Sequence, residues 1–189
     1  MDFNFTDEQE LLKESFAELC ERYIDEKDIP AMYENHATPH KLDMAYLEAG
    51  FGLMGLPEEY GGIECDMVTL GMLTEEFVHH AGFTAPYLNA TLALRDMVDF
   101  GTPEQIKMCF DAYQETGKPI FSLGFSEPGA GSDNQNMTSV TRIQPDGTYL
   151  LSGQKTWVTN GENFPLVLVI AKDEDPSRDN REMSMWLVP

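Results

Sequence analysis

The sequence contains few basic side chains. Its 189 residues include 12 Lys and Arg against 33 Asp and Glu, which gives a formal net charge of −21. The imbalance is concentrated in residues 1–117, with 24 acidic and 6 basic side chains, whereas residues 118–189 carry 9 and 6. Because no basic patch is available to meet phosphate groups, we expect neither nucleic acid nor a membrane as a partner.

Cysteine is also rare, and its distribution argues against two kinds of site. Cys20, Cys65 and Cys109 are odd in number and widely separated, which fits neither a disulfide framework nor a zinc cluster. His79 and His80 are adjacent and would diverge on a helix, so they do not form a metal site either. We therefore expect no bound metal, and reduced thiols as in a cytosolic protein.

Long apolar runs are missing as well. No stretch approaches the ~18 apolar residues of a membrane-spanning helix. Residues 1–4 show neither the basic region nor the apolar core of a signal peptide. We therefore expect a cytoplasmic protein.

What the first 117 residues do contain is helical signals. Thr6 to Gln9 form a capping box that starts a helix. Behind it, four apolar residues share one helical face: Leu12, Phe16, Leu19 and Tyr23. Periodicity and a second capping box predict further helices over residues 41–49, 67–80, 88–99 and 102–117. Between the first two helices, residues 29–39 are predicted to form a loop.

Gly50 to Gly55 formally match the G-x-G-x-x-G fingerprint of dinucleotide-binding folds. That fingerprint requires a strand before it and a helix opening within it. Here a helix is predicted before Gly50, and residues 56–62 are predicted to be a loop. We therefore interpret Gly50 as the cap of the preceding helix and reject a dinucleotide site at this position.

Beyond residue 117 the periodicity becomes that of strands. Short strands are predicted over residues 120–125, 140–144, 149–151, 164–171 and 183–188, with a turn at 145–148 joining the second and third. The predicted fold class is therefore α+β. It comprises an all-helical N-terminal domain over residues 1–117 and a partial antiparallel β-barrel or sandwich over residues 118–189.

Residues 126–133 form the first of two polar, glycine-rich segments. Pro128, Gly129 and Gly131 break the preceding strand. Glycines allow the backbone to approach a ligand closely, and successive amides in such a turn make a concavity for anions. Ser126 and Ser132 add hydroxyl groups at its edges. An ordinary loop between strands remains the alternative interpretation.

Residues 153–161 form the second segment. Thr156 to Thr159 have the β-branched and aromatic content of a strand, which would place Trp157 and Thr159 on the same side. The indole of Trp157 would then either fill the core, as an isolated tryptophan commonly does, or offer a flat face to a planar cofactor.

Together and in this order, the two segments resemble the flavin-contacting signatures of the acyl-CoA dehydrogenase family, and the likeness extends from Phe5 to Pro189. The resemblance implies FAD as the cofactor. The residues that it implies for FAD contacts are Leu123, Phe125, Ser126, Gly131, Ser132, Trp157, Val158 and Thr159. Ser132 would also touch the acyl-CoA substrate, Trp157 would lie against the isoalloxazine, and Thr159 would hydrogen-bond near flavin N5. Two positions depart from the family pattern: Ser126 replaces a common Thr, and Leu123 replaces an aromatic found in several members.

The resemblance implies an oxidoreductase that acts on the CH–CH group of an acyl-CoA thioester. An α-proton would be abstracted and a β-hydride transferred to flavin N5, in the dehydrogenase direction or in the reverse enoyl-CoA reductase direction. For a full-length member it also implies electron-transfer flavoprotein as a partner, and a homotetramer. Residues 1–4 and 7–11 resemble the start of crotonobetainyl-CoA reductases.

We assign no catalytic residue in this sequence. In the family, the carboxylate base lies in a second helical bundle, and Glu127 corresponds to a loop residue. We therefore expect a fragment or truncated product that binds FAD weakly and catalyses little. The alternative is a non-catalytic truncated paralogue that acts as a binding or assembly module.

Overall fold

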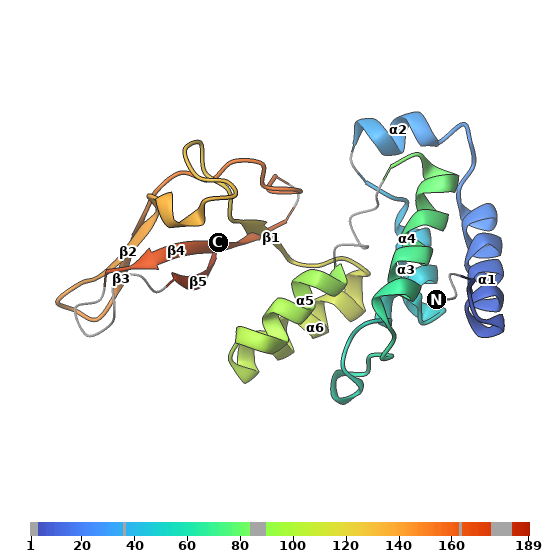
Figure 1. Cartoon of the computed structure of the whole chain (residues 1–189), viewed down its shortest axis with the longest axis horizontal. Coiled ribbons are helices and arrows are strands. Elements are labelled where there is room, and N and C mark those ends of the chain that lie inside the picture. The colour runs from blue at the N-terminus through green and yellow to red at the C-terminus, as the bar shows by residue number, and fades with distance from the viewer. Residues whose placement is uncertain (1–3, 36, 84–89, 163, 175–182) are drawn as a thin grey trace. The chain divides into compact units, whose positions relative to one another are not determined.

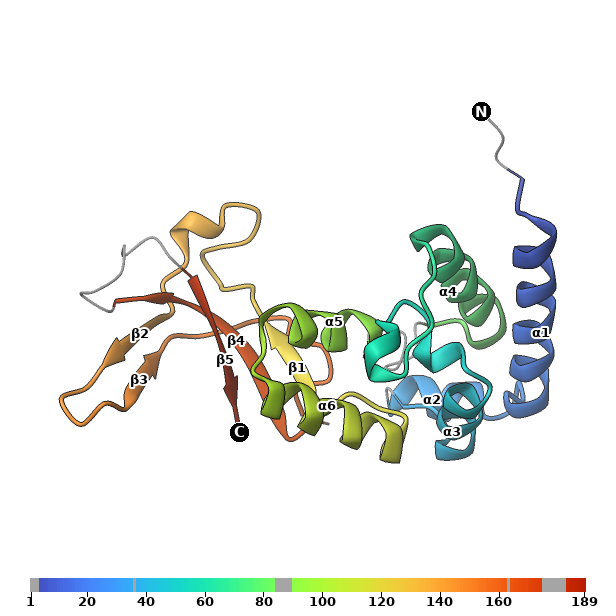
Figure 2. The same cartoon turned by 90° about the horizontal axis from the view of Figure 1, so that it is seen from below.

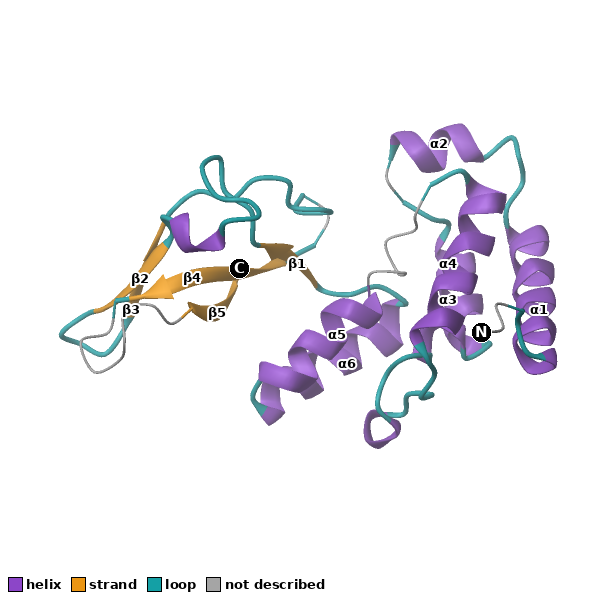
Figure 3. Ribbon diagram, viewed as in Figure 1, coloured by secondary structure: helices purple, strands orange, loops and turns teal. Residues whose placement is uncertain are grey.

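Figures 1 and 2 show the computed structural model of the chain, which describes residues 4–35, 37–83, 90–162, 164–174 and 183–189. The chain divides into two units, Met1–Pro119 and Ile120–Pro189. Colouring by secondary structure separates them at once, because the first unit is helical and the second contains the strands (Figure 3). The predicted fold class, a helical domain followed by a β-domain, is confirmed.

Helix α1 (Asp7–Tyr23) begins at the predicted capping box. Thr6 Oγ1 accepts the Gln9 amide at 3.1 Å, and Gln9 Oε1 accepts the Thr6 amide at 3.0 Å. Acidic residues in the first turn add a favourable interaction with the helix dipole. The predicted apolar face is confirmed, because Phe16 is fully buried and Leu12, Leu19 and Tyr23 pack around the same core.

The other helices of this unit are α2 (Ile29–Glu34), α3 (His40–Glu48), α4 (Met67–Ala81), α5 (Ala90–Phe100) and α6 (Pro103–Thr116). The loop predicted over residues 29–39 is wrong in its first half, because α2 forms there. Pro30 lies in the first turn of α2, where its missing N–H costs nothing, and Met32 is buried beneath the helix. Residues 88 and 89, the predicted start of α5, lie outside the described residues. Among the residues that are described, none of the helices combines the length and apolar character that a bilayer crossing requires.

The core of the helical unit is built around Phe16. Its ring lies 4.8 Å from that of Phe51 and 5.8 Å from that of Tyr46, so α1 packs on α3 and on the 3-10 turn η1 (Phe51–Leu53). Gly50 caps α3 in the left-handed region (φ 87°), as predicted, and a helix precedes it. The dinucleotide fingerprint is therefore correctly rejected. Tyr113 of α6 donates to the Gly52 carbonyl at 2.7 Å and fixes η1 from the other side.

The strands of the second unit form one sheet around β4 (Leu166–Asp173). Its members are β1 (Phe121–Gly124), β2 (Val140–Ile143), β3 (Tyr149–Ser152), β4 and β5 (Met183–Val188). β2 and β3 form the predicted hairpin, and β5 runs antiparallel to β4. β1 and β2 run parallel to β4, so the sheet is mixed: the predicted antiparallel pairing is confirmed for β2–β3 and β4–β5 but is wrong for these two pairs. Both parallel pairs join strands separated by a long stretch of chain, residues 125–165 for β1 and β4 and residues 144–165 for β2 and β4, and parallel pairing requires such a long connection.

Candidate functional site

The first glycine-rich segment is an open turn at the end of β1. The Glu127 amide donates to the Ala130 carbonyl at 3.0 Å, and the Ala130 amide returns a bond to Glu127 at 3.3 Å. Between them the chain reverses through Pro128 and Gly129. A side chain added at Gly129 would meet nothing within 4 Å, so the backbone of this turn is accessible from outside.

The second segment is not a strand, which corrects the prediction for residues 156–159. The chain is irregular from Gly153 to Val158 and then turns. Trp157 has φ 58°, in the left-handed region that bulky side chains avoid. This conformation breaks the alternation on which a shared side for Trp157 and Thr159 depended. The side chain of Trp157 is 91% exposed, which also excludes the interpretation of this residue as core.

The two segments meet directly. The Thr156 amide donates to the Ser126 carbonyl at 2.8 Å, where a strand would have donated to a sheet neighbour. Lys155 Nζ donates to the Phe125 carbonyl and lies 2.9 Å from Glu127 Oε1. Residues about thirty positions apart in sequence are therefore held side by side, next to the exposed indole of Trp157.

Glu127 is the centre of this junction. Its carboxylate is buried and accepts the Thr138 amide at 2.6 Å, the Thr138 hydroxyl at 2.7 Å and the Ser139 amide at 2.9 Å, in addition to Lys155. Burial alone raises the pKa of Glu127, but the hydrogen bonds from Ser139, Lys155 and Thr138 outweigh it and hold the pKa well below its ordinary value. Glu127 is therefore an ionised carboxylate, and each of its two oxygens accepts two hydrogen bonds.

The residues implied for FAD contacts all lie in or beside these two segments. Leu123 on β1 and Phe125 just after it are 38% and 36% exposed, which is unusual for apolar side chains at the end of a buried strand. Ser126 and Val158 are half-buried. The other exposed members are Gly131, Ser132, Trp157 and Thr159. The structure joins Phe125 and Ser126 to the second segment by hydrogen bonds, whereas Leu123 lies on β1 and the remaining residues lie along the two loops.

Sequence reasoning missed two residues of the junction, Glu127 as an anchor and Lys155 as its partner. Glu127 was interpreted as a loop residue, and Lys155 was assigned no role. Their pairing joins positions 28 apart, and no local pattern predicts such a contact. One signal was available in the sequence: an acidic residue, Glu127, directly follows the predicted contact residue Ser126, and a basic residue, Lys155, lies two positions before Trp157.

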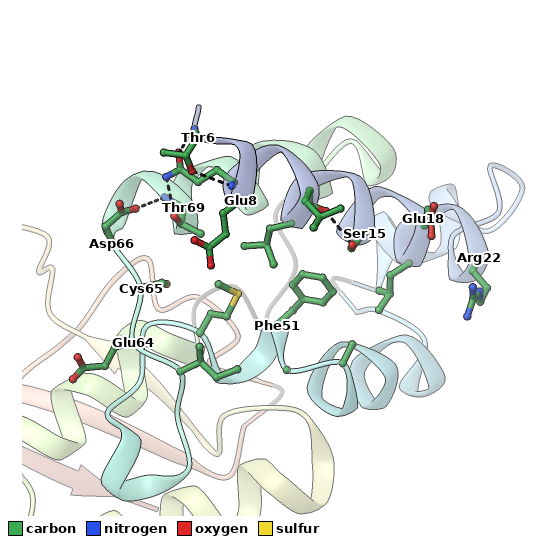
Figure 4. A pocket seen from close by; sticks show the side chains of 18 residues that line it. Thr6, Glu8, Ser15, Glu18, Arg22, Phe51, Glu64, Cys65, Asp66 and Thr69 are labelled. Carbon is green, nitrogen blue, oxygen red and sulfur yellow. Dashed lines mark hydrogen bonds between the residues drawn. The ribbon is translucent and has the colours of Figure 1, made fainter. Parts of the chain in front are cut away.

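The helical unit has a separate groove of about 890 Å³ along α1 (Figure 4). Phe51 and Met54 are among its apolar lining residues, and two other lining residues are joined by a hydrogen bond, from Gln9 Nε2 to Thr69 Oγ1 at 3.1 Å. Charged residues of the groove are Glu8, Glu18, Glu64, Asp66 and Arg22. Burial raises the pKa of the Cys65 thiol, so this cysteine is a poor nucleophile. None of the residues implied for FAD contacts lines the groove.

Comparison with known proteins gives a consistent result. The sequence profile of the acyl-CoA dehydrogenase N-terminal domain matches residues 6–112, and that of the middle domain matches residues 122–189. The probable acyl-CoA dehydrogenase YdiO of Escherichia coli is 35% identical over 188 residues, which is 100% of this chain and 49% of YdiO. The chain thus spans about half the length of the curated relatives that it matches.

Solved structures show the same fold. An acyl-CoA dehydrogenase from Slackia heliotrinireducens superposes with a TM-score of 0.80 and 26% identity, over 100% of this chain and 48% of that one. PigA, solved as an FAD complex, superposes with a TM-score of 0.75 and 23% identity, over 100% of this chain and 49% of that one. At that identity the likeness to PigA shows the fold alone. With both domain profiles matched in order, the chain belongs to the acyl-CoA dehydrogenase family, as the two glycine-rich segments had indicated.

Proposed function

We propose that this chain supplies the helical domain (residues 1–117) and the flavin-binding part of the β-domain (residues 118–189) of an FAD-dependent acyl-CoA dehydrogenase, or of the reverse enoyl-CoA reductase. The observation that carries the proposal is the junction of the two segments. It holds an exposed indole beside a turn of accessible backbone, and the family places its cofactor at these segments.

The geometry fits a planar, anionic cofactor. An indole that is 91% exposed with φ 58° combines uncovered apolar surface with backbone strain, and both are typical of a surface that a ligand covers. A flat aromatic ring system stacked on Trp157 would contribute about 0.5–1.5 kcal/mol beyond the burial of area. The open backbone at Gly129 and at Gly131, with the Ser126 and Ser132 hydroxyls, provides donors for phosphate groups.

Each residue has a defined task in this proposal. Trp157 and Val158 pack against the ring system, Thr159 donates a hydrogen bond at the ring edge, and Leu123 and Phe125 provide apolar contacts. Ser132 contacts both FAD and the acyl-CoA. When bound, FAD supplies the hydride acceptor. Glu127 is unsuited to be the α-proton base, because its carboxylate is buried, ion-paired and held at a lowered pKa.

The electron partner and the assembly belong to the proposal for the whole enzyme. We propose electron-transfer flavoprotein as the acceptor of electrons and a tetramer as the assembly, as the family resemblance implies. A second candidate function for this chain is a binding or assembly module without catalysis. The groove along α1 favours it, because a surface lined by both apolar and charged side chains suits a partner better than a reacting thioester.

A titration of the purified chain with FAD tests the proposal. We expect saturable quenching of tryptophan emission and a shifted flavin absorption band, because Trp157 stacks on the ring. Trp157→Ala should abolish the quenching, whereas the control Trp186→Phe should keep it, because Trp186 packs against Tyr149 with ring centroids 4.6 Å apart. Binding of FAD that is equally tight without Trp157 would contradict the proposed site, and absence of FAD binding by the wild-type chain would favour the module.

A further inference from the structure

We infer that Glu127 and Lys155 are positioning residues, whose buried ion pair sets the relative register of the two glycine-rich segments and thereby the place at which Trp157 is presented. The inference rests on the proposed function for the identity of the ligand. It adds a role for two residues that contact neither a cofactor nor a substrate in that proposal.

The pair ties three stretches of chain together. Glu127, in the first segment, accepts the amides of Thr138 and Ser139, which lead into β2. Lys155, in the second segment, reaches Glu127 Oε1 and the Phe125 carbonyl, both at 2.9 Å. Neither loop lies in a strand at these positions, so the regular ladder of the sheet does not fix them.

Both charged groups are withdrawn from water. The exposed fractions of the side chains are 9% for Lys155 and 1% for Glu127. A buried pair of this kind contributes little net stability, since desolvation offsets the Coulomb attraction, and its best-attested use is to specify register. Here the hydrogen-bond partners of the pair, Phe125, Thr138 and Ser139, lie on these stretches, so a shift of either loop would break several bonds at once.

Close packing at the same junction leaves little freedom for the loops to slide. A Cβ at Gly153, where the second segment starts, would lie 2.1 Å from Ser139 Oγ and 2.6 Å from Ser139 Cα. The backbone of the second segment therefore passes directly over Ser139, whose amide Glu127 holds. Trp157 is two residues beyond Lys155, so its position follows from the point where Lys155 is held.

Amide hydrogen exchange on the chain as it stands tests the inference without any ligand. We expect the amides of Thr138, Ser139 and Thr156 to be protected in the wild type. In Lys155→Met and in Glu127→Gln, all three should exchange faster together, while amides within β4 and β5 keep their protection. Lys172→Met is the matched control, because Lys172 also donates to a backbone carbonyl in this unit, that of Gln135 at 2.7 Å. It should leave the three amides unchanged.

FAD affinity provides the second measurement. Lys155→Met should lower the affinity for FAD about tenfold or more. Ile170→Ala, which trims a half-buried side chain of β4 without altering the pair, should lower it much less at a similar unfolding midpoint. Lys155→Arg keeps the charge and should retain most of the protection at Thr156.

Each measurement can overturn the positioning role of the pair. Unchanged exchange at Thr156 in Lys155→Met overturns the inference, and so does a loss of FAD affinity no larger than that in Ile170→Ala. Loss of protection throughout β4 and β5 in both Lys155→Met and Glu127→Gln would assign the pair to global stability and would also overturn it. If the wild-type chain binds no FAD, the proposed function fails, and the exchange measurement alone still tests the positioning role.

Discussion

The core of the helical unit and the two glycine-rich segments of the sheet unit use their aromatic side chains in opposite ways. In the helical unit, Phe16 and Phe77 are fully buried and the rings of Phe16, Tyr46 and Phe51 pack together. In the sheet unit, Trp157 is 91% exposed, and Leu123 and Phe125 are more than one-third exposed. The rings of the helical core therefore stabilise their own unit, whereas the side chains at the two segments leave apolar surface available to a ligand.

Their buried polar groups differ in the same sense. In the helical unit, buried Asp43 meets Thr38 and Lys118, and burial raises its pKa. In the sheet unit, buried Glu127 has four donors and a lowered pKa. The two glycine-rich segments are therefore organised around a carboxylate whose oxygens are all hydrogen-bonded, whereas the helical unit is stabilised by its own core.

The largest effect that separates the two units should come from aromatic truncation. Phe16→Ala should lower the free energy of unfolding by about 3–5 kcal/mol, because it removes the centre of the helical core. Trp157→Ala should change it by no more than about 0.5 kcal/mol, because the indole is exposed. Urea denaturation followed by far-UV circular dichroism measures both. Similar losses in the two variants would mean that the assigned difference between the units is wrong.

Glycine substitutions should give the next largest effect, and they distinguish the tightly packed second segment of the sheet unit from the open turn of the first. Gly153→Ala should lower its stability by about 1–3 kcal/mol, because the new Cβ would lie 2.1 Å from Ser139 Oγ. Gly129→Ala is the matched control in the other segment, where a Cβ meets nothing within 4 Å, and it should be nearly neutral. Thermal unfolding of the two variants provides the comparison, and equal shifts in midpoint would contradict the close approach at Gly153.

Acid should change the stability of the two units in opposite directions: it should destabilise the sheet unit through Glu127 and stabilise the helical unit through Asp43. Because the pKa of Glu127 is lower in the folded state, its contribution to stability is present above the ordinary value of 4.5 and is lost as the pH falls through the folded value. Because the pKa of Asp43 is raised above 3.8, the folded state holds its proton more tightly, and acid favours folding at that group.

A pH series of unfolding experiments therefore distinguishes the units. Trp157 and Trp186 are the two tryptophans of the sequence and both lie in the sheet unit, so tryptophan emission follows that unit while far-UV circular dichroism is dominated by the helices. Below pH 4.5 we expect the midpoint from emission to fall before the helical signal does. Glu127→Gln should remove much of this difference. A helical signal that is lost first would contradict the assignment.

The sequence predicted the elements that have local causes. Both capping boxes, the α1 face around Phe16, the Gly50 cap and the β2–β3 hairpin depend on residues a few positions apart, and the structure contains all of them. Two errors arose where a long-range contact decides. Residues 156–159 have strand composition, yet the Thr156 amide is bonded to Ser126, and β1 pairs in parallel with β4 across residues 125–165.

The candidate site, too, was predictable only where local sequence determines it. The two segments were visible as motifs, and the family resemblance related them to a flavin. Their junction was not visible, because the partner of Glu127 is a lysine 28 residues away and nothing in the local pattern distinguishes Lys155 from a solvated side chain. The exposure and the left-handed backbone of Trp157 likewise follow from that junction, since Lys155 and Thr156 are both held immediately before it.

The smallest effect on stability should come from relieving the backbone of Trp157. At φ 58° a non-glycine residue bears a penalty of about 1–2 kcal/mol, which glycine does not have, while glycine loses more chain entropy on folding by about 0.5–1 kcal/mol. Trp157→Gly should therefore leave the free energy of unfolding unchanged or raise it by about 1 kcal/mol, and it should still abolish FAD quenching. The matched control is Asn160→Gly, which relieves φ 59° nearby without removing a ring. Equilibrium denaturation and FAD titration of both variants separate strain from recognition: if Asn160→Gly loses the ligand as well, loop conformation rather than the indole determines binding.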